Sequence, residues 1–492
     1  MTTTAIRKDQ GEPEIHNPYL EGNYAPVDRE VTATQLDVTG TIPDYLDGRY
    51  LRNGPNPITV DRSTYEWFTG AGMVHGLRIR DGKAEWYRNR WVRSGAVARD
   101  FGEKWPGGPL QGGLDFASNT NVIGHAGRTL AITEAGVTPY ELNDELETVG
   151  PFDFCGTLRG GYTAHPKRDP VSGELHAVSY SPFHGNRVQY TVTGTDGLIK
   201  RAIEIPLGQS PMMHDFSLTE RYVVLYDLPV VLDLAAVFKG KTMRTIATQL
   251  TKFATKYPMP GPMESAVQRA SRLRAPDVPL PYHWDPKHRA RVGVLPRDGV
   301  ASDIRWFDVG QCYVYHPLNA YDDGDRIVLD VVRHTKVFDG TGPIGGPTTL
   351  DRWTVDLTAG QVREERLDDR VQEFPRVDER LVGKRHRYGY AVGHDRDQEG
   401  FPTPDSILKH DLTTQSTETV RFGRNSQPGE FVFAPRTADA AEDDGVLMGF
   451  VYNADAGKSD LVFLDAASLE TVATVHLPAR VPNGFHGNWI ES

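Results

Sequence analysis

The sequence has very little cysteine and no long apolar run. Its 492 residues include only Cys155 and Cys312, which excludes a disulfide framework and suits a reducing interior. Residues 1–16, MTTTAIRKDQGEPEIH, lack the apolar core of a secretory signal, and no window approaches the roughly 18 apolar residues that cross a bilayer. We therefore expect a soluble, cytoplasmic protein with a disordered tail over 1–16.

An excess of positive charge is also missing. The chain has 54 Lys and Arg against 66 Asp and Glu, a net charge of −12. Binding of nucleic acid needs a positive field over the contact surface, so nucleic acid is excluded as the main partner. No GxGxxG or Walker sequence stands in the right context for a nucleotide site. Nothing in the sequence indicates an obligate protein partner.

Glycine and proline, in contrast, are plentiful and scattered. The 49 Gly and 34 Pro residues disfavour long helices. Between them lie short β-branched and aromatic runs such as 222–232, 326–334 and 446–453, with turn dipeptides such as Asp323-Gly324. Seven blades would take about 70 residues each, so an all-β, seven-bladed β-propeller spanning 1–492 as a single domain fits better than a sandwich. No clean repeat fixes the blade number.

One stretch departs from the β pattern. Residues 234–263 contain no Asp or Glu, and apolar residues recur there at helical spacing at Ile246, Leu250, Phe253 and Tyr257. The pattern predicts a basic amphipathic helix inside a helical insertion over 233–275. Two interpretations stay open: the helix caps the scaffold with its apolar stripe buried, or it makes a peripheral contact with a membrane surface.

Four of the 16 histidines stand where strands could aim them inward: His165, His214, His316 and His486. Their separations of 49, 102 and 170 residues exclude a zinc finger or an HExxH helix. The inner strands of a propeller converge on its axis, so one His from each of four blades could meet there and bind Fe(II). Spacing alone does not select these four, because a single His is more often a hydrogen-bonded or surface residue.

Ten sequence runs give a reason to select these four histidines. They are NPYLEGNYAPV, IPDYLDGRYLRNGPNP, WFTGAGMVHGLRI, GGYTAHPKRDPVSGELH, MMHDFSLTERYVVLYDLP, HPLNAYDDGDRIVLDVVRH, LDRWTVDL, QEFPRVDERLVG, GEFVFAP and LPARVPNGFHGNW. In this order, over 17–489, they resemble the carotenoid cleavage oxygenase family. The resemblance implies a seven-bladed propeller with a dome of loops and helices over an axial non-haem iron. It matches the four iron ligands of the family to His165, His214, His316 and His486.

The resemblance also implies carboxylates that orient the ligands. Glu134 in ITEAG, Glu373 in QEFPRV and Glu430 in PGEFVF match these positions. A carboxylate that accepts the second ring N–H fixes the tautomer and plane of a ligating imidazole. Without the resemblance, each Glu would be read as a solvated strand residue. With three acids for four histidines, His165 is expected to lack a carboxylate partner.

Other motif residues have less specific readings. Thr120 matches a family position whose methyl group leans over a vacant iron site, although a core Thr on an inner strand is an equal alternative. Trp67, Phe68 and Phe485 could line a substrate tunnel or form ordinary core. His75, in GMVHGL, does not match a ligand position, and we expect it to be structural.

The resemblance implies a dioxygenase with one Fe(II) per chain and O2 as co-substrate. It would cleave a C=C bond of an apolar polyene, a carotenoid or apocarotenoid, into two aldehydes that each take up oxygen. A first alternative is cleavage of a phenolic stilbene of the lignostilbene or resveratrol type. Family members that cut stilbenes place a Lys before the supporting Glu, where this chain has Thr133. A second alternative is a non-catalytic propeller that serves as a binding scaffold.

Overall fold

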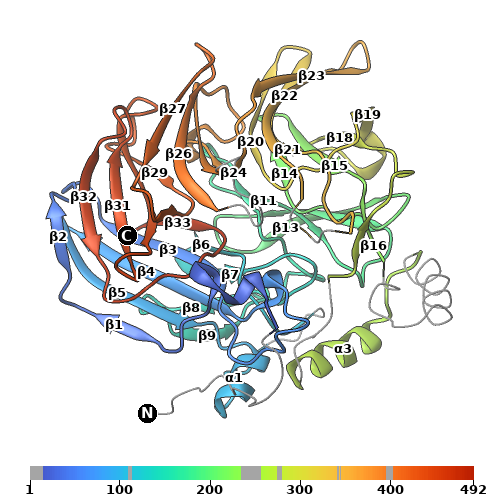
Figure 1. Ribbon diagram of the computed structural model, residues 1–492. Helices are drawn as coiled ribbons and strands as arrows, with labels where there is room; N and C mark the ends of the chain where they lie inside the picture. The colour runs from blue at the N-terminus through green and yellow to red at the C-terminus, as the bar shows by residue number, and fades with distance from the viewer. Residues whose placement is uncertain are drawn as a thin grey trace.

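Seven β-sheets stand around a central axis in the computed structural model (Figure 1). The structure describes residues 15–108, 114–233, 256–273, 280–340, 343, 345–394 and 403–492. The predicted all-β, seven-bladed propeller is confirmed.

Five blades are each built from four neighbouring strands of one chain segment. From the inner to the outer strand, the first two are β6 (Asn121–His125), β7 (Arg128–Ile132), β8 (Tyr140–Leu142) and β9 (Thr148–Pro151), and then β10 (Lys167–Arg168), β11 (Leu175–Tyr180), β12 (Arg187–Thr193) and β13 (Ile199–Pro206). The third is β14 (Phe216–Leu218), β15 (Tyr222–Asp227), β18 (Arg291–Pro296) and β19 (Arg305–Asp308). The last two are β20 (Pro317–Asp323), β21 (Arg326–His334), β22 (Thr348–Asp356) and β23 (Gln361–Asp368), and then β24 (Gln372–Arg376), β25 (Tyr388–His394), β26 (Pro404–Asp411) and β27 (Ser416–Arg421).

The other two blades join the two ends of the chain. One runs β33 (Gly487–Glu491), β3 (Gly48–Pro55), β4 (Gly72–Arg80), β5 (Lys83–Trp91) and β1 (Val31–Ala33). The other runs β28 (Ser426–Pro428), β30 (Gly445–Asn453), β31 (Lys458–Asp465), β32 (Thr471–His476) and β2 (Asp37–Gly40), with β29 (Val432–Pro435) also paired to β30. Each end of the chain thus completes a blade formed mainly by the other end. Because the two ends of the chain pair in this way, β33 is an inner strand, and His486, which directly precedes it, lies at the axis.

Burial along the strands explains why these sequences form blades. The central strand β21, RIVLDVVRH, is an almost continuous apolar run and is buried over most of its length because neighbouring blades cover both faces. The outer strand β13, IKRAIEIP, alternates half-buried and exposed side chains instead. Trp353 on β22 is fully buried in the largest core cluster, between blades.

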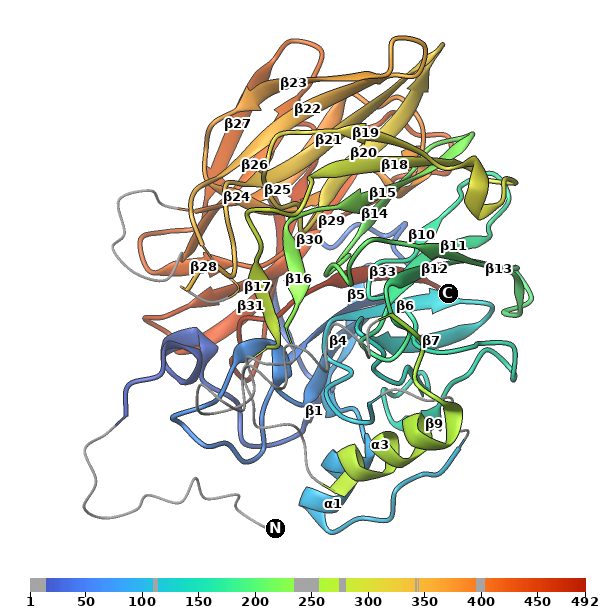
Figure 2. The same ribbon diagram turned by 90° about the vertical axis from the view of Figure 1, so that its right-hand side faces the viewer.

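Short helices and a small ribbon lie beyond the blades. The ribbon pairs β16 (Val230–Leu232) with β17 (Tyr282–Trp284). The helices α1 (Gly95–Phe101) and α3 (Gly261–Leu273) pack side by side (Figure 2). Hydrogen bonds from Asp115 N to Ser271 Oγ, at 2.8 Å, and from Gln268 Nε2 to Thr138 Oγ1, at 3.1 Å, tie α3 to the segments around β6–β9.

The predicted insertion over 233–275 is described only in part. Helix α3 falls within it, whereas residues 234–255, with Ile246, Leu250 and Phe253, lie outside the described residues. Residues 1–14 of the predicted tail lie outside them as well. In the part of the chain that the structure describes, no helix has the length and apolarity needed to cross a membrane.

Candidate metal centre

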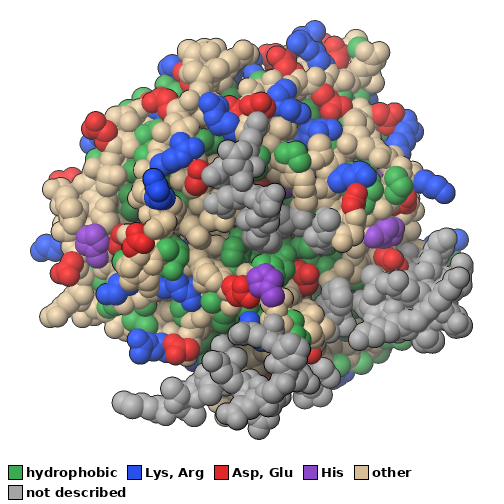
Figure 3. All heavy atoms as spheres, viewed as in Figure 1, with side chains coloured by type: hydrophobic (Ala, Val, Ile, Leu, Met, Phe, Trp, Pro, Cys, Tyr) green, Lys and Arg blue, Asp and Glu red, His purple; other side chains and the backbone are tan. Residues whose placement is uncertain are grey.

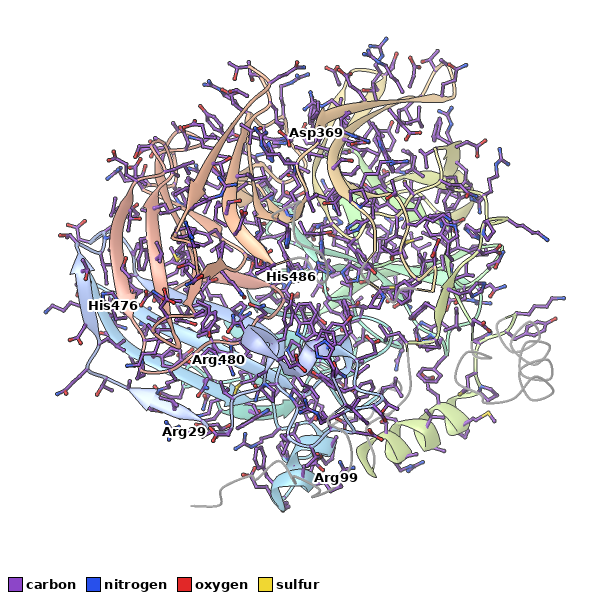
Figure 4. The ribbon with its side chains drawn as sticks, viewed as in Figure 1. Arg29, Arg99, Asp369, His476, Arg480 and His486 are labelled. Atoms are coloured by element: carbon purple, nitrogen blue, oxygen red, sulfur yellow. The ribbon has the colours of Figure 1, made fainter. Side chains whose placement is uncertain are left out.

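Four histidines stand where inner strands begin, in four different blades. His165 lies two residues before β10 and His214 two residues before β14. His316 and His486 directly precede β20 and β33. Since the inner strands line the axis, their starts come together, and His486 lies near the centre of the ring (Figure 4).

The four imidazoles converge on one point. One ring nitrogen from each of the four lies within 4.8 Å of the corresponding nitrogens of the others, and all four side chains are buried. The Nε2 atoms of His165 and His214 are 3.0 Å apart, and those of His214 and His316 are 3.2 Å apart. Within the described ranges, this is the one group of three or more His, Cys, Asp or Glu side chains that could hold a metal ion.

Three carboxylates support this cluster from outside. Each accepts a hydrogen bond from one Nδ1 atom: Glu134 from His214 at 2.8 Å, Glu373 from His316 at 2.6 Å, and Glu430 from His486 at 2.9 Å. An ionised carboxylate only accepts hydrogen bonds, so the ring proton sits on Nδ1 in each pair. The Nε2 lone pairs of these three rings are therefore directed toward the centre of the cluster.

This donor set fits a metal cation. With both Nδ1 atoms protonated, the Nε2 atoms of His214 and His316 present two lone pairs to each other at 3.2 Å, which cannot form a hydrogen bond and call for a cation between them. Burial lowers the pKa of His165 well below its usual value and also lowers the pKa of His316, so both rings are neutral. Burial opposes a positive charge at His214 too, but Glu134 outweighs it and raises the pKa, so the environment of this ring favours positive charge, which a metal cation at Nε2 supplies in place of a proton. Neutral imidazoles with open positions suit Fe(II).

His165 has a different environment from the other three. Its Nδ1 is 3.8 Å from Asp215 Oδ2, beyond hydrogen-bond distance. That Oδ2 atom instead accepts a hydrogen bond from Lys167 Nζ at 2.8 Å. His165 therefore has no directly bonded carboxylate among the described residues, which is the arrangement that the resemblance implies.

A cavity of about 820 Å³ reaches the cluster from one side. His214, His316 and His486 lie in its wall, and the rings of Phe68 and Phe485 stack beside them with centroids 5.3 Å apart. Figure 3 shows hydrophobic side chains near the centre of the face that it views. Among the described residues of the wall, the only carboxylates or cationic chains are Glu134 and Glu373, and both are bonded to histidines.

Thr120 lies in this wall and is 6% exposed. Its hydroxyl donates to Asn119 Oδ1 at 3.0 Å, and its carbonyl accepts from the backbone N–H of His486 at 3.0 Å. The hydroxyl of the side chain is thus engaged by Asn119. His75 lies outside the cluster, on β4, where its Nδ1 is 3.0 Å from the hydroxyl of Tyr87.

A second, smaller cavity of about 70 Å³ lies behind the cluster. His165, Lys167, Asp215 and Arg376 contribute to its wall, and so does Glu430. The guanidinium of Arg376 lies 3.5 Å from Glu430 Oε1. Charged side chains therefore surround the cluster on this side.

Sequence reasoning missed one residue beside the cluster. His334 Nε2 lies 2.7 Å from Glu373 Oε1, so Glu373 contacts two histidines. His334 belongs to the same sequence run as His316, and the β20–β21 hairpin pairs Pro317 with Val331, which brings the two histidines to one end. A hairpin between His316 and His334 places both at the same end of the two strands, and this spacing could have indicated His334.

Comparisons with known proteins agree with this architecture. The profile of the family described as retinal pigment epithelial membrane protein matches residues 24–491. A carotenoid cleavage oxygenase from Mycobacterium tuberculosis is 51% identical over 494 residues, covering 97% of this chain and 98% of that protein. The crystal structure of lignostilbene dioxygenase from Pseudomonas brassicacearum matches with a TM-score of 0.82 and 25% identity, covering 98% of this chain and all of that one. A variant of the Synechocystis apocarotenoid oxygenase matches with a TM-score of 0.77 and 25% identity, covering 96% and 98%.

Proposed function

Because this chain belongs to the retinal pigment epithelial membrane protein family, we propose that it is a carotenoid cleavage dioxygenase. The reaction adds O2 across one C=C bond of a carotenoid or apocarotenoid and yields two aldehydes, each with one of the oxygen atoms. One observation carries the proposal: three of the four clustered histidines lie in the wall of a large, mainly apolar cavity.

The proposal assigns one Fe(II) to His165, His214, His316 and His486. When bound, Fe(II) supplies the electrons that allow O2 to react with an alkene. The protein contributes the placement of the ligands. Three of the four ligand positions are each set by a carboxylate: Glu134, Glu373 or Glu430 accepts the hydrogen bond from Nδ1. In these three rings the proton therefore stays on Nδ1, and the Nε2 lone pair remains available to the metal.

The methyl group of Thr120 is proposed to restrict the space beside the metal. Its hydroxyl is held by Asn119 and its carbonyl by the His486 backbone, so the side chain has a fixed orientation relative to that ligand. A fixed methyl group excludes water from the position it covers. Trp67 and Phe485, with ring centroids 4.4 Å apart, extend this dry surface along the cavity wall.

The lining of the cavity supports an apolar polyene as substrate. A charged ligand would need a counter-charge there, and the two carboxylates of the described wall already bind histidines. Aromatic and aliphatic side chains such as Phe68, Met212 and Leu280 supply most of the remaining surface. Binding would gain from burial of the long apolar chain, with few polar contacts to fix its ends.

A phenolic stilbene is the second candidate substrate, favoured by the similarity to lignostilbene dioxygenase. The wall position before Glu134 argues for the carotenoid. Thr133 stands there, and its Oγ1 accepts hydrogen bonds from the backbone N–H groups of Asn119 and Thr120 at 2.9 and 3.2 Å. No cation is available at that position to meet a phenolate oxygen.

Peripheral membrane contact is a further part of the proposal, because carotenoids reside in membranes. Tyr257 and Met263 are 57% and 58% exposed and also line the cavity, and Lys256 Nζ lies 5.8 Å from the ring centroid of Tyr257. Exposed apolar side chains beside a cation favour an anionic lipid surface. A Tyr257→Asp, Met263→Asp double variant should co-sediment with anionic liposomes several-fold less than wild type. Unchanged sedimentation would contradict membrane contact through this segment.

Identification of products tests the function directly. The iron-loaded protein is incubated under 18O2 with a hydrocarbon carotene, an apocarotenal and a phenolic stilbene, and the aldehydes are identified by mass. We expect paired aldehydes from a polyene, a label in both new carbonyls, and one O2 consumed per bond cut. Faster cleavage of the stilbene would favour the second substrate. A metal-free chain that consumes no oxygen would favour the binding scaffold.

A further inference from the structure

Glu373 is the only one of the three supporting carboxylates that contacts two histidines in the described part of the chain. Its Oε2 accepts from His316 Nδ1 at 2.6 Å and from its neighbour, the Phe374 backbone N–H, at 2.5 Å. Its Oε1 lies 2.7 Å from His334 Nε2. Both oxygens therefore have a partner that fixes their direction.

The other two carboxylates are held differently. The second oxygen of Glu430 accepts from the Gly487 backbone N–H at 2.8 Å, with Arg376 close to the first. The Oε2 atom of Glu134 is buried and has no hydrogen-bond partner among the described residues. The support of the cluster thus ranges from a doubly anchored carboxylate to a singly anchored one.

Among the described residues, the ring of His334 makes one hydrogen bond, to Glu373, and an edge-to-face contact with Tyr315 at 5.1 Å between centroids. Its side chain is 6% exposed, and its Nδ1 atom is buried without a hydrogen-bond partner. Because Nε2 faces a carboxylate, the ring proton sits on Nε2 and is donated to Glu373. A neutral His334 ring therefore contributes one charge-assisted hydrogen bond, which goes to Glu373.

The backbone places His334 rigidly beside His316. His334 ends β21 and exchanges two backbone hydrogen bonds with Tyr313, at 2.8 and 2.9 Å. Val332 N donates to His316 O at 3.1 Å, so both histidines belong to one rigid blade. Glu373 comes from β24 of the next blade. The two imidazoles together hold this carboxylate across the boundary between blades.

We propose that His334 is a positioning residue for the metal centre, acting through Glu373 on His316. The terminal torsion of a glutamate is broad, and the bonds from His316 and the Phe374 backbone both end on Oε2, so they leave Oε1 free to swing about that atom. The bond from His334 holds Oε1 and so fixes the carboxylate plane, and His316 then donates its Nδ1–H in one geometry. This inference uses the assignment of His316 as a ligand and does not depend on which substrate is cleaved.

Metal binding without substrate tests this role. The metal-free protein and its His334→Phe and His334→Gln variants are titrated with Co(II) against a competing chelator, and the visible spectrum of the bound Co(II) is recorded. Loss of the direct partner of a metal ligand, here Glu373, typically costs about 10–100-fold in affinity. His334→Phe loosens that partner without removing it, so we expect a loss at the lower end of this range, about 10-fold, with an altered spectrum. The Gln amide can donate from the place of Nε2, so His334→Gln should recover to within about 3-fold of wild type.

His410→Phe is the matched control. His410 is also buried, and its Nε2 lies 2.8 Å from Oε1 of Gln372, the residue next to Glu373. This variant loses that bond and a second one, between His410 Nδ1 and Thr417 Oγ1 at 2.9 Å, without touching Glu373, so its Co(II) affinity and spectrum should match wild type.

Two results would overturn the proposal. One is wild-type Co(II) affinity and spectrum in His334→Phe. The other is an equal loss in the Phe and Gln variants together with an equal drop in the melting temperature of the metal-free protein, which would indicate packing alone. If wild type binds Co(II) and iron but cleaves no polyene, the proposed function fails while the role of His334 stands.

Discussion

The two cavities on either side of the histidine cluster differ in size and in chemistry. The front cavity, of about 820 Å³, is lined mainly by aromatic and aliphatic side chains. The rear cavity, of about 70 Å³, is lined by Lys167, Asp215, Arg376 and Glu430 among others. His214 lines only the front and His165 only the rear, whereas the other two histidines of the cluster line both.

This difference shows how one axis can hold both a dry substrate site and a polar support. The cations Lys167 and Arg376 pair with Asp215 and Glu430 behind the cluster, where no apolar substrate needs to pass. Unpaired charges in the front wall would cost binding free energy for a polyene. The histidines therefore act as a partition between the two compartments.

The largest expected effect comes from breaking the partition. His316→Ala removes a ring that lines both cavities. We expect iron content to fall well below one per chain and turnover to fall by at least about 100-fold, since a ligand is lost rather than its support. Metal analysis and an oxygen-consumption assay measure both. His75→Gln, a buried site bonded to Tyr87 away from the cluster, should keep iron and activity. Full activity in His316→Ala would contradict the ligand assignment.

A charge placed in the front cavity tests its apolar character. Phe68→Asp puts a carboxylate beside Phe485, with no cation among the described wall residues to pair with it. Because an unpaired buried charge is costly, we expect kcat/KM for a polyene to fall by about 10–100-fold while the iron content stays unchanged. Phe68→Leu should lose less than about 3-fold, because the wall stays apolar. Equal losses in both variants would mean that ring shape matters and charge does not.

Acid unfolding of the protein tests the charge pairing in the rear cavity. Burial alone would raise the pKa of Glu430, but His486 and Arg376 lower it from 4.5 to about 2. Ionised Glu430 therefore stabilises the fold above pH 4.5, and this contribution is lost as the pH falls toward 2. Arg376→Met raises that pKa, so acid unfolding should begin at higher pH, by about one unit.

Circular dichroism between pH 2 and 6 measures the midpoint of this acid transition. Arg436→Met is the control, since Arg436 forms an exposed ion pair with Asp444 at 2.8 Å and should leave the midpoint unchanged. An equal midpoint for Arg376→Met and wild type would show that Arg376 does not stabilise the ionised Glu430.

The sequence was sufficient to predict the blades and the histidines that separate the two cavities, because local patterns and motifs identify both. Short strands and turn dipeptides predicted a propeller, and the resemblance supplied the residues that cluster at the axis. It could not show that His334 anchors Glu373, because that contact crosses two blades. The rear cavity was invisible for the same reason: Lys167 and Arg376 meet there from separate sheets. Periodicity reports local structure, whereas these contacts depend on how the blades are arranged around the axis.

The smallest expected effect concerns substrate choice in the front cavity. Thr133→Lys places a cation beside Glu134, whose Oε2 has no hydrogen-bond partner among the described residues. We expect cleavage of a phenolic stilbene to rise several-fold and cleavage of a polyene to fall by about 2–5-fold, since the ammonium can meet a phenolate but leaves an apolar chain beside a charge. Competition assays with both substrates in one vessel measure the ratio. Thr133→Val, which removes only the hydroxyl, should lower both activities alike by releasing the backbone N–H groups of Asn119 and Thr120. A ratio unchanged in Thr133→Lys would mean that substrate choice is set elsewhere in the wall.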